Sequence, residues 1–398
     1  MGPGGDGQRL NPLAFIGRLR IGLIAGASLA VILTAALIAF YLLRPSVPPR
    51  LTLSSARFAD VPGWQGDRLS EAIPAFLHSC EHYLGKSDDT PLDPGPAKPG
   101  LGRPDYGTIA EWRPACKTAA ALPAGDDNAA RQFFETVFVP QLAGNNGNND
   151  GLFTGYFEIT LDGSLRRGGR FQTPLYRRPP DPARYNRAEI EDGALAGQGL
   201  ELVWVDNPID AFFLEIQGSG IVRLQNGGTM RVGYDGGNSH PYVPVGRLML
   251  ERGILPRDQI SMATIRDWMQ AHPKEGAALR RENPSYVFFR VIHGPGPLGA
   301  EHVVLTPRRS LAVDRAFLAF GLPIWLDARE RFGPEAHRQL VIAQDTGGAI
   351  KGPVRGDLFW GDGKKAADAA GKMNARGRYW LLLPKSVAAR LEQTVAAR

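Results

Sequence analysis

The sequence lacks most of the patterns that hold metal ions and nucleotides. Only two of its 398 residues are cysteine, its seven histidines are scattered, and no Cys-x-x-Cys or His-Glu-x-x-His motif occurs. A Gly-x-x-x-x-Gly-Lys-[Ser/Thr] loop and a Gly-x-Ser-x-Gly turn are also absent. These absences argue against zinc proteases of the His-Glu-x-x-His type, P-loop nucleotide-binding proteins and α/β-hydrolases, which rely on these motifs. We expect no cofactor and no metal site.

The chain also has no long run of lysines or arginines. Its formal net charge is +6, and the 22% of its residues that are charged are spread along the chain. A nucleic-acid partner is therefore not expected. The composition is 43% hydrophobic, which at this length is enough apolar material for about two folded domains. With 48 glycines and 32 prolines, loops and short strands are favoured over a helical bundle.

One long apolar run lies near the N-terminus. Residues 21–43 carry no charge and would span roughly 34 Å as a helix, which is enough to cross the apolar core of a bilayer. Arg18 and Arg20 precede this run, which favours a cytoplasmic N-terminus. We therefore predict a single-pass transmembrane anchor, with a cytoplasmic segment 1–20 before it and a linker 44–56 after it. A cleaved signal peptide is the alternative, although its apolar core is usually shorter.

The two cysteines, Cys80 and Cys116, belong to the exported part of the chain under this interpretation. Compartments outside the cytoplasm are oxidising, so a disulfide between the two residues is favoured. Two buried free thiols are the alternative. A proline-rich stretch lies between the cysteines, and a disulfide would close it into a loop.

The order of apolar patterns indicates the fold class. Short aromatic and β-branched runs, broken by Gly, Pro and Asp, predict strands from about residue 152 and again from 284 onward. This order of helices, strands, a helical break and further strands predicts an α+β fold that is mainly β. Helical spacing of apolar residues predicts helices over 67–84, 108–122, 127–143, 242–252 and 257–272.

Carboxylates are the remaining candidates for chemistry. Three aspartates, Asp314, Asp345 and Asp357, each border an apolar run in the last strand-rich section. An aspartate at the edge of an apolar wall loses contact with water, which raises its pKa and lets it act as a general acid near neutral pH. Trp360, three residues after Asp357, offers a flat face to a sugar ring. The alternatives are a turn-forming role for each aspartate and a core position for the tryptophan.

The motifs from about residue 151 to 384 resemble one enzyme family in kind and in order. The runs AVD, AQDTGGAIKG and GDLFWG resemble the three-aspartate (3D) domain. The upstream part resembles the other half of the membrane-bound lytic murein transglycosylase A (MltA) family, through the runs GYFE, FQTPLYRRP, DAFFLEIQGSGIVRL, GNSHPYVPVGRLML and NPSYVFFR. The first 60 residues lie outside the resemblance, and the segment 67–143 matches only loosely.

The resemblance implies a particular version of the α+β fold. It implies a double-psi β-barrel catalytic domain, a second β-rich domain inserted in it, and a groove for a glycan strand between the two. On this basis we predict that residues 57–160 form the N-terminal helices and the first part of the barrel. Residues 161–290 would form the inserted domain, and residues 291–398 the 3D domain that completes the barrel.

The resemblance also implies roles for individual residues. The catalytic aspartate of the family is the last of its three, which falls on Asp357, while Asp345 and Asp314 support the site. Independently of the resemblance, Trp360 is a further substrate-binding candidate because its flat apolar face suits a sugar ring. The candidates for lining the groove, residue by residue from the motifs, are Thr154, Gly155, Tyr156, Gln217, Gly218, Ser219 and Lys351.

The reaction of the family is cleavage of peptidoglycan without water. Lytic transglycosylases break the β-1,4 bond between N-acetylmuramic acid and N-acetylglucosamine and leave a 1,6-anhydro sugar. We therefore expect one aspartate to act first as general acid and then as general base. A glycoside hydrolase that uses two carboxylates, with Asp345 as the second, is the first alternative. A non-catalytic protein that binds the cell wall is the second.

The apolar run near the N-terminus and the family resemblance also indicate the partners and the location. The expected partners are the glycan strands of peptidoglycan and, through the N-terminal helix, the inner membrane; protein partners are not predicted. The catalytic part would face the periplasm. Export after signal cleavage, to the periplasm or the outer membrane, is the alternative. The best-known members of the family are lipoproteins, whereas this chain has no cysteine near its N-terminus to accept a lipid.

Overall fold

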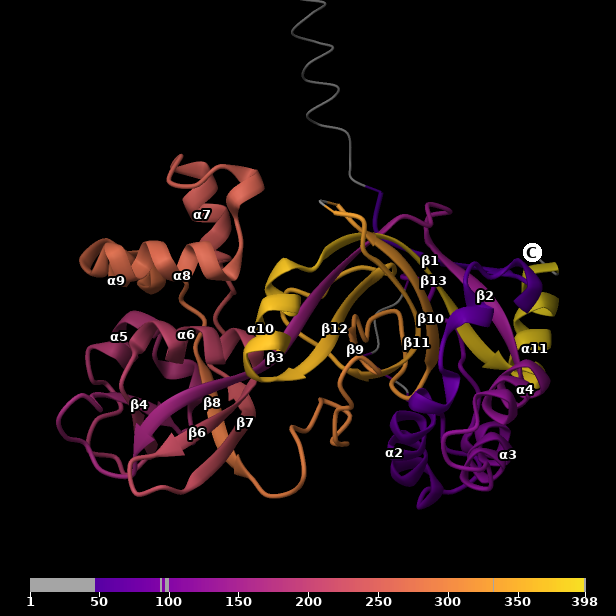
Figure 1. Ribbon diagram of the computed structural model, residues 1–398, viewed down its shortest axis with the longest axis horizontal. Helices are drawn as coiled ribbons and strands as arrows, with labels where there is room; N and C mark the ends of the chain where they lie inside the picture. Colours follow the sequence, from indigo (N-terminus) through magenta and orange to yellow (C-terminus); the bar gives the residue numbers. More distant parts are fainter. Residues whose placement is uncertain (1–46, 94, 97–99, 332, 397–398) are drawn as a thin grey trace, which may run out of the picture. The chain divides into compact units, whose positions relative to one another are not determined.

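All strands in the described part of the chain belong to one mixed sheet (Figure 1). The computed structural model describes residues 47–93, 95–96, 100–331 and 333–396. The 13 strands of the sheet are β1 (Leu51–Ser55), β2 (Phe138–Asn145), β3 (Gly151–Ser164), β4 (Thr173–Tyr176), β5 (Glu201–Val205), β6 (Ser219–Leu224), β7 (Thr229–Gly237), β8 (Val287–Ile292), β9 (Ser310–Val313), β10 (Pro323–Glu330), β11 (Ala336–Asp345), β12 (Arg355–Asp362) and β13 (Asn374–Pro384).

The strand order brings distant parts of the sequence together. Along the main path the order is β1-β2-β13-β10-β11-β9-β12-β3-β6-β7-β8, and β4 and β5 are attached beside β3. Strand β13 also pairs with β3, so the path from β13 through β10, β11, β9 and β12 returns through β3 as a ring. The pairs β12–β3, β11–β9 and β3–β6 are parallel, which makes the sheet mixed.

The long strand β3 joins the two groups of strands. Its first half pairs with β12 and β13, and its second half pairs with β6 and β5. Figure 1 shows β3 extending from the strands around β12 to those around β6. Because successive side chains of a strand point to opposite faces, Thr154 and Tyr156 share one face of β3 while Gly155 lies on the other.

The predicted fold class is wrong. The resemblance implies a double-psi β-barrel with a second β-rich domain inserted in it, whereas all strands of the described residues pair into one mixed sheet, part of which closes as a ring. The physical reason is that β3 is 14 residues long and contains no turn, so hydrogen bonding continues from one group of strands to the other. The predicted transmembrane helix, 21–43, lies outside the described residues. Within the described ranges, no helix is long and apolar enough to cross a bilayer.

The helices are interspersed with the strands along the chain. Five short 3-10 turns are η1 (Phe58–Asp60), η2 (Trp64–Gly66), η3 (Leu69–Ala72), η4 (Pro182–Arg184) and η5 (Arg257–Gln259). The α-helices in the described ranges are α2 (Ile73–Leu84), α3 (Ile109–Ala120), α4 (Asp127–Val137), α5 (Arg187–Glu191), α6 (Pro208–Gln217), α7 (Val245–Glu251), α8 (Met262–Ala271), α9 (Pro273–Arg281), α10 (Gly363–Lys372) and α11 (Lys385–Ala396).

Three predicted helices, 67–84, 127–143 and 257–272, are longer than the helices that form there, α2, α4 and α8. The expected helix 127–143 ends at Val137, and its last residues belong to β2. Pro140 has no N–H group to donate within a helix, and β2 pairs with β1 on one side and β13 on the other. The start of the helix is set by Asp126, whose carboxylate accepts hydrogen bonds from the amides of Asn128 and Ala129.

Helices α2, α3 and α4 lie together in Figure 1 and form a helical head on the sheet. Their buried side chains share one core with Trp325 of β10, and the Trp64 and Trp325 rings lie 5.1 Å apart. A disulfide joins Cys80 on α2 to Cys116 on α3, with their Cα atoms 5.5 Å apart. The head is therefore both packed and covalently cross-linked.

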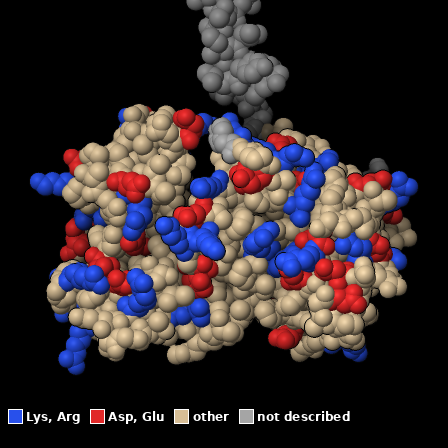
Figure 2. Space-filling view, viewed as in Figure 1, with Lys and Arg blue, Asp and Glu red and all other residues tan. Residues whose placement is uncertain are grey.

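A second core packs around β3 from Phe157 onward. Side chains of β3, β6, α6 and α10 pack there, including the buried Phe212 and Phe213 of α6 and Ala370 of α10. Figure 2 shows acidic and basic side chains interspersed over the visible face, so no single-sign surface dominates it.

Candidate active site

Asp357 on β12 lies directly opposite Thr154 on β3. The two strands are parallel, and these two residues are partners in the register. The Thr154 hydroxyl donates a hydrogen bond to Oδ1 of Asp357. Arg355 Nη2 in turn donates to the same hydroxyl oxygen at 2.8 Å. The guanidinium, the hydroxyl and the carboxyl thus form a short chain of hydrogen bonds across two strands.

Asp357 has a pKa suited to proton transfer. Burial and, less strongly, the negative charge of Asp345 raise the pKa of this carboxyl to about 6, against the opposing effects of Arg355 and Thr154. A carboxyl with a pKa near this value is protonated in an appreciable fraction of molecules close to neutral pH. It can give a proton to a leaving group and then take one back.

Asp345 lies at the end of β11 and is held by three donors. The Tyr156 hydroxyl donates to Oδ2 at 2.8 Å, and the amides of Ala300 and Thr346 donate to Oδ1 at 2.9 and 2.8 Å. Burial raises the pKa of Asp345, while these hydrogen bonds oppose that shift because they stabilise the charged form. All of these contacts are internal, which suits a supporting role for this residue.

Asp314 follows β9 and holds the turn before Asp357. It is 7% exposed, and its carboxylate accepts hydrogen bonds from the amides of Ala316 at 3.0 Å and Gly352 at 2.8 Å. The second bond fixes the segment between β11 and β12. Lys351, in the same segment, is exposed to solvent.

Trp360 does not lie beside Asp357. A Cβ atom placed on Gly155 would lie 2.6 Å from Nε1 of Trp360, so the indole covers the face of β3 to which Gly155 belongs. Asp357 contacts Thr154, whose side chain is on the opposite face. The Trp360 ring instead contacts His337 edge-on, with ring centroids 5.8 Å apart.

Gln217, Gly218 and Ser219 lie where α6 turns into β6. Gly218 ends the helix with φ at 82°, a conformation that glycine adopts without strain. Gln217 Oε1 accepts a hydrogen bond from the Phe157 amide at 2.9 Å, at the point where β3 passes from its β12 partner to its β6 partner. Ser219 is buried and paired with β7. The structure thus uses Gln217 to hold β3, within one strand position of Tyr156.

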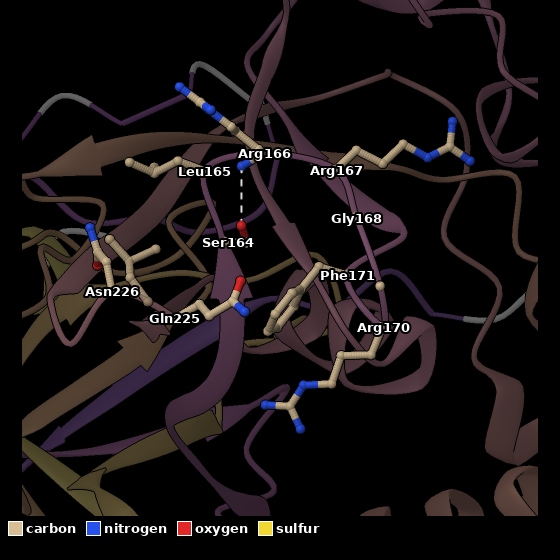
Figure 3. A pocket seen from close by; sticks show the side chains of 11 residues that line it. Ser164, Leu165, Arg166, Arg167, Gly168, Arg170, Phe171, Gln225 and Asn226 are labelled. Carbon is tan, nitrogen blue, oxygen red and sulfur yellow. Dashed lines mark hydrogen bonds between the residues drawn. The ribbon is translucent and has the colours of Figure 1, made fainter.

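Two cavities lie away from Asp357. A cavity of about 870 Å³ is lined by residues of β3, α6, α8, β12 and α10, and Trp360 is among them. Another, of about 610 Å³, lies at the loop between β3 and β4, beside the end of β6 (Figure 3). The side chains of Arg166, Arg167 and Arg170 point in different directions there, so they do not converge on one ligand. Asp357 lines neither cavity.

The described residues were also compared with the ligand sets that hold metal ions. In the ranges that the structure covers, no group of three or more His, Cys, Asp or Glu side chains is arranged to hold a metal ion.

Some residues of the site were not anticipated. Arg355 lies two positions before Asp357, on the same face of β12, and the period of two in a strand could have indicated it. Ala300 and Glu301 lie in the connection between β8 and β9, and Ala300 acts through its backbone amide. No side-chain pattern indicates a backbone donor, so this contact could be found only in the structure.

The fold and the site together define a class of protein. A buried carboxyl with a raised pKa, linked to a hydroxyl and a guanidinium and close to a second carboxyl, is typical of enzymes that transfer protons. Two family models match the chain: the MltA specific insert domain over residues 152–290, and the 3D domain over residues 309–383.

Relatives of known name are similar to the chain over most of its length. It is 35% identical over 288 residues to the membrane-bound lytic murein transglycosylase A of Vibrio cholerae, covering 70% of this chain and 75% of the relative. A solved membrane-bound lytic murein transglycosylase from Agrobacterium tumefaciens has a TM-score of 0.74 and 31% identity, covering 85% of this chain and 99% of that one. Escherichia coli MltA with bound chitohexaose has a TM-score of 0.63 and 27% identity, covering 85% and 95%.

The chain therefore belongs to the membrane-bound lytic murein transglycosylase A family and is an enzyme. This confirms the resemblance that the motifs indicate.

Proposed function

We propose that the chain cleaves the glycan strands of peptidoglycan as a lytic transglycosylase, with Asp357 as its single acid and base. The observation that carries this proposal is the environment of Asp357. Burial raises its pKa to about 6. The Thr154 hydroxyl donates to the carboxyl, Arg355 donates to that hydroxyl, and both groups stabilise the charged form. The name of the family and the chitohexaose in the Escherichia coli relative support a glycan as substrate.

The reaction begins with the protonated carboxyl of Asp357. It donates its proton to the oxygen of the β-1,4 bond between N-acetylmuramic acid and N-acetylglucosamine, and the bond from C1 to that oxygen breaks. Positive charge develops at C1 of the muramic acid. The hydroxyl on C6 of the same sugar then attacks C1 and gives its proton to the Asp357 carboxylate. The products are a 1,6-anhydro end and a free N-acetylglucosamine end, and no water is consumed.

One carboxyl is sufficient because the nucleophile is part of the substrate. The C6 hydroxyl is already held close to C1, so the enzyme does not have to place a water molecule. Asp357 returns to its protonated form at the end of each cycle. Between the two steps its negative charge is stabilised by the Thr154 hydroxyl and, through it, by Arg355.

Asp345 has a different role in this proposal. Its three internal donors leave it poorly placed to activate water, which a two-carboxylate hydrolase would require. Its negative charge instead raises the pKa of Asp357 and so favours the protonated state from which the reaction starts. Asp314 fixes the turn that leads into β12.

We also propose that the enzyme acts in the periplasm in association with the inner membrane. Its relatives are named membrane-bound, which supports a location at a membrane. Fractionation of cells that express the full chain, with inner and outer membranes separated by density, tests this part. Activity found only in the outer-membrane fraction would contradict it.

The reaction is tested by mass spectrometry of the soluble products from purified peptidoglycan. The chain and its Asp357→Asn variant are compared at equal concentration. We expect muropeptides that are one water lighter than hydrolysis products, and none from the variant. Products that carry the full water would contradict the transglycosylase reaction and point to a hydrolase. Glycan binding without any product from either protein would contradict catalysis.

A further inference from the structure

Glu301 is a buried carboxyl close to the site that the proposed reaction does not use. Glu301 is 3% exposed. Its Oε2 accepts a hydrogen bond from the Ser79 hydroxyl at 2.7 Å, and its Oε1 accepts one from the Tyr83 hydroxyl at 2.6 Å. Both donors lie on α2. A single side chain therefore ties the connection between β8 and β9 to the helical head.

The backbone around Glu301 is bonded to the end of β11. The Ala300 amide donates to Oδ1 of Asp345 at 2.9 Å, and the Glu301 amide donates to the Gln344 carbonyl at 3.1 Å. A Cβ atom on Gly299 would lie 2.4 Å from the same carbonyl oxygen, so this segment approaches β11 as closely as a glycine allows. The segment 299–301 thus lies between α2 and Asp345 and contacts both.

The head offers a firm support for this segment. Gln344 Nε2 donates to the Ala75 carbonyl at 2.7 Å and to the Ser79 hydroxyl at 2.9 Å, which joins β11 to α2 a second time. The next residue of the helix, Cys80, is cross-linked to α3 through Cys116. The donors that hold Glu301 therefore belong to a helix with little freedom to shift.

We propose that Glu301 is a positioning residue for catalysis, which holds the Ala300 amide against Asp345 by anchoring the segment 299–301 to α2. This inference rests on the proposed function, because it concerns the carboxyl pair of that site. It also assigns the helical head a role, because the head would hold the Ala300 amide in place through Glu301.

The consequence is electrostatic. The Ala300 amide stabilises the charged form of Asp345, and the charge of Asp345 raises the pKa of Asp357. The other groups that face this pair are Tyr156 and Thr154 on β3 and Arg355 on β12. When the amide moves away, Asp345 is charged less often, so Asp357 loses its proton at a lower pH.

Glu301 is itself affected by its surroundings. Burial raises its pKa to about 7, while the hydroxyls of Tyr83 and Ser79 oppose that shift. Asp93 raises the pKa and Lys86 lowers it through their charges. Both states of the carboxyl can accept at least one of the two hydroxyl donors, so its geometry is compatible with anchoring on either side of this pH.

The test compares Glu301→Ala with Glu301→Gln in the full chain, through the pH profile of product release from peptidoglycan. We expect Glu301→Ala to lower kcat on the order of tenfold, with KM little changed, because the carboxyl pair is misplaced while the substrate surface is kept. The limb of the profile on which activity falls with rising pH should move to lower pH. Glu301→Gln keeps the size of the side chain and a carbonyl acceptor, and should restore both kcat and the profile.

Two further measurements keep this result unambiguous. Thermal unfolding shows whether Glu301→Ala is folded at the assay temperature; if it is not, Tyr83→Phe, which removes one donor to Glu301, decides in the same assay. A folded variant whose pH profile matches that of the unchanged protein overturns the inference. If Asp357→Asn is inactive and Glu301→Ala retains the original profile, only this inference fails. An active Asp357→Asn variant overturns the proposed function as well.

Discussion

The hydroxyl of Thr154 donates a hydrogen bond to Oδ1 of Asp357 across the parallel pair of β3 and β12. The same oxygen of Thr154 accepts a hydrogen bond from Arg355 at 2.8 Å. A hydroxyl that donates to a carboxyl favours its charged form, so Thr154 limits how far burial raises the pKa of Asp357. In the proposed reaction, this contact therefore adjusts the balance between the protonated and the charged form of Asp357.

The first prediction concerns Thr154→Val, which keeps the shape of the side chain and removes the hydroxyl. The pKa of Asp357 should rise above about 6, and the limb on which activity falls with pH should move to higher pH. The value of kcat should fall roughly tenfold or more, because the carboxylate formed after proton donation loses a hydrogen bond. The measurement is the pH profile of kcat on purified peptidoglycan. Thr154→Ser is the matched control and should behave like the unchanged protein; a Val variant with the original limb contradicts the role of the hydroxyl.

The second prediction concerns the pH dependence of the unchanged enzyme. The proposed reaction starts from protonated Asp357, whose pKa is raised to about 6, mainly by burial. The value of kcat/KM should therefore decline tenfold per pH unit well above that pKa. Initial rates at constant ionic strength, measured between mildly acidic and mildly basic pH, check this. Activity that rises through neutral pH would mean that the carboxylate, and not the acid, starts the reaction.

The third prediction concerns stability. The raised pKa of Asp357 means that the folded protein binds this proton more tightly than the unfolded chain, so its contribution to stability is lost as pH rises through about 6. Asp357→Asn removes that dependence, and at neutral pH the variant should be more stable by roughly 1–3 kcal/mol. Below the ordinary pKa of an aspartate the two proteins should unfold alike. Urea titrations at both pH values measure the difference, and equal stability at neutral pH would contradict the burial of this carboxyl.

Much of the site could be predicted because its chemistry lies in short motifs. The three aspartates and the Thr-Gly-Tyr run are each readable in the sequence, and the structure brings Thr154, Tyr156, Asp345 and Asp357 to one region. The position of Trp360, in contrast, could not be predicted from the motif alone. A bulge near the end of β12, between Phe359 and Asp362, shifts the pairing register, and the indole lies on the face that Gly155 leaves open.

The fold was harder to predict than the site. Strand pairing joins residues that are far apart in the chain, such as β2 with β13, and no local pattern indicates such partners. The strand-rich stretch predicted from about residue 152 includes the apolar run at Phe212 and Phe213, but this run forms α6. The helix starts after Asn207, whose side chain accepts hydrogen bonds from the amides of Ile209 and Asp210. A continuous apolar run is compatible with either structure, so the cap is the better guide.

The fourth prediction concerns Gly155→Ala. The added Cβ would lie 2.6 Å from Nε1 of Trp360 and 2.8 Å from the Cα of Ala370, and the backbone of α10 cannot rotate away. We expect a loss of roughly 1–3 kcal/mol in the free energy of unfolding, as for other overpacked sites. Chemical denaturation measures it. Gly168→Ala, where the Cβ meets open space, is the control and should change stability little. Equal stability of the two variants would contradict the close packing of Trp360 on β3.

The last prediction concerns the disulfide between Cys80 and Cys116, which cross-links α2 and α3. Replacing both cysteines with serine should lower the free energy of unfolding by roughly 2–4 kcal/mol, mainly because the unfolded chain gains freedom. Denaturation of the double variant, beside the unchanged protein under oxidising and reducing conditions, measures this. Since Ser79 and Tyr83 on α2 hold Glu301, the folded double variant should also lose part of its kcat while keeping its KM. If reduction leaves both the unfolding midpoint and kcat unchanged, α2 is held by packing alone, and the cross-link contributes nothing to the position of the active-site groups.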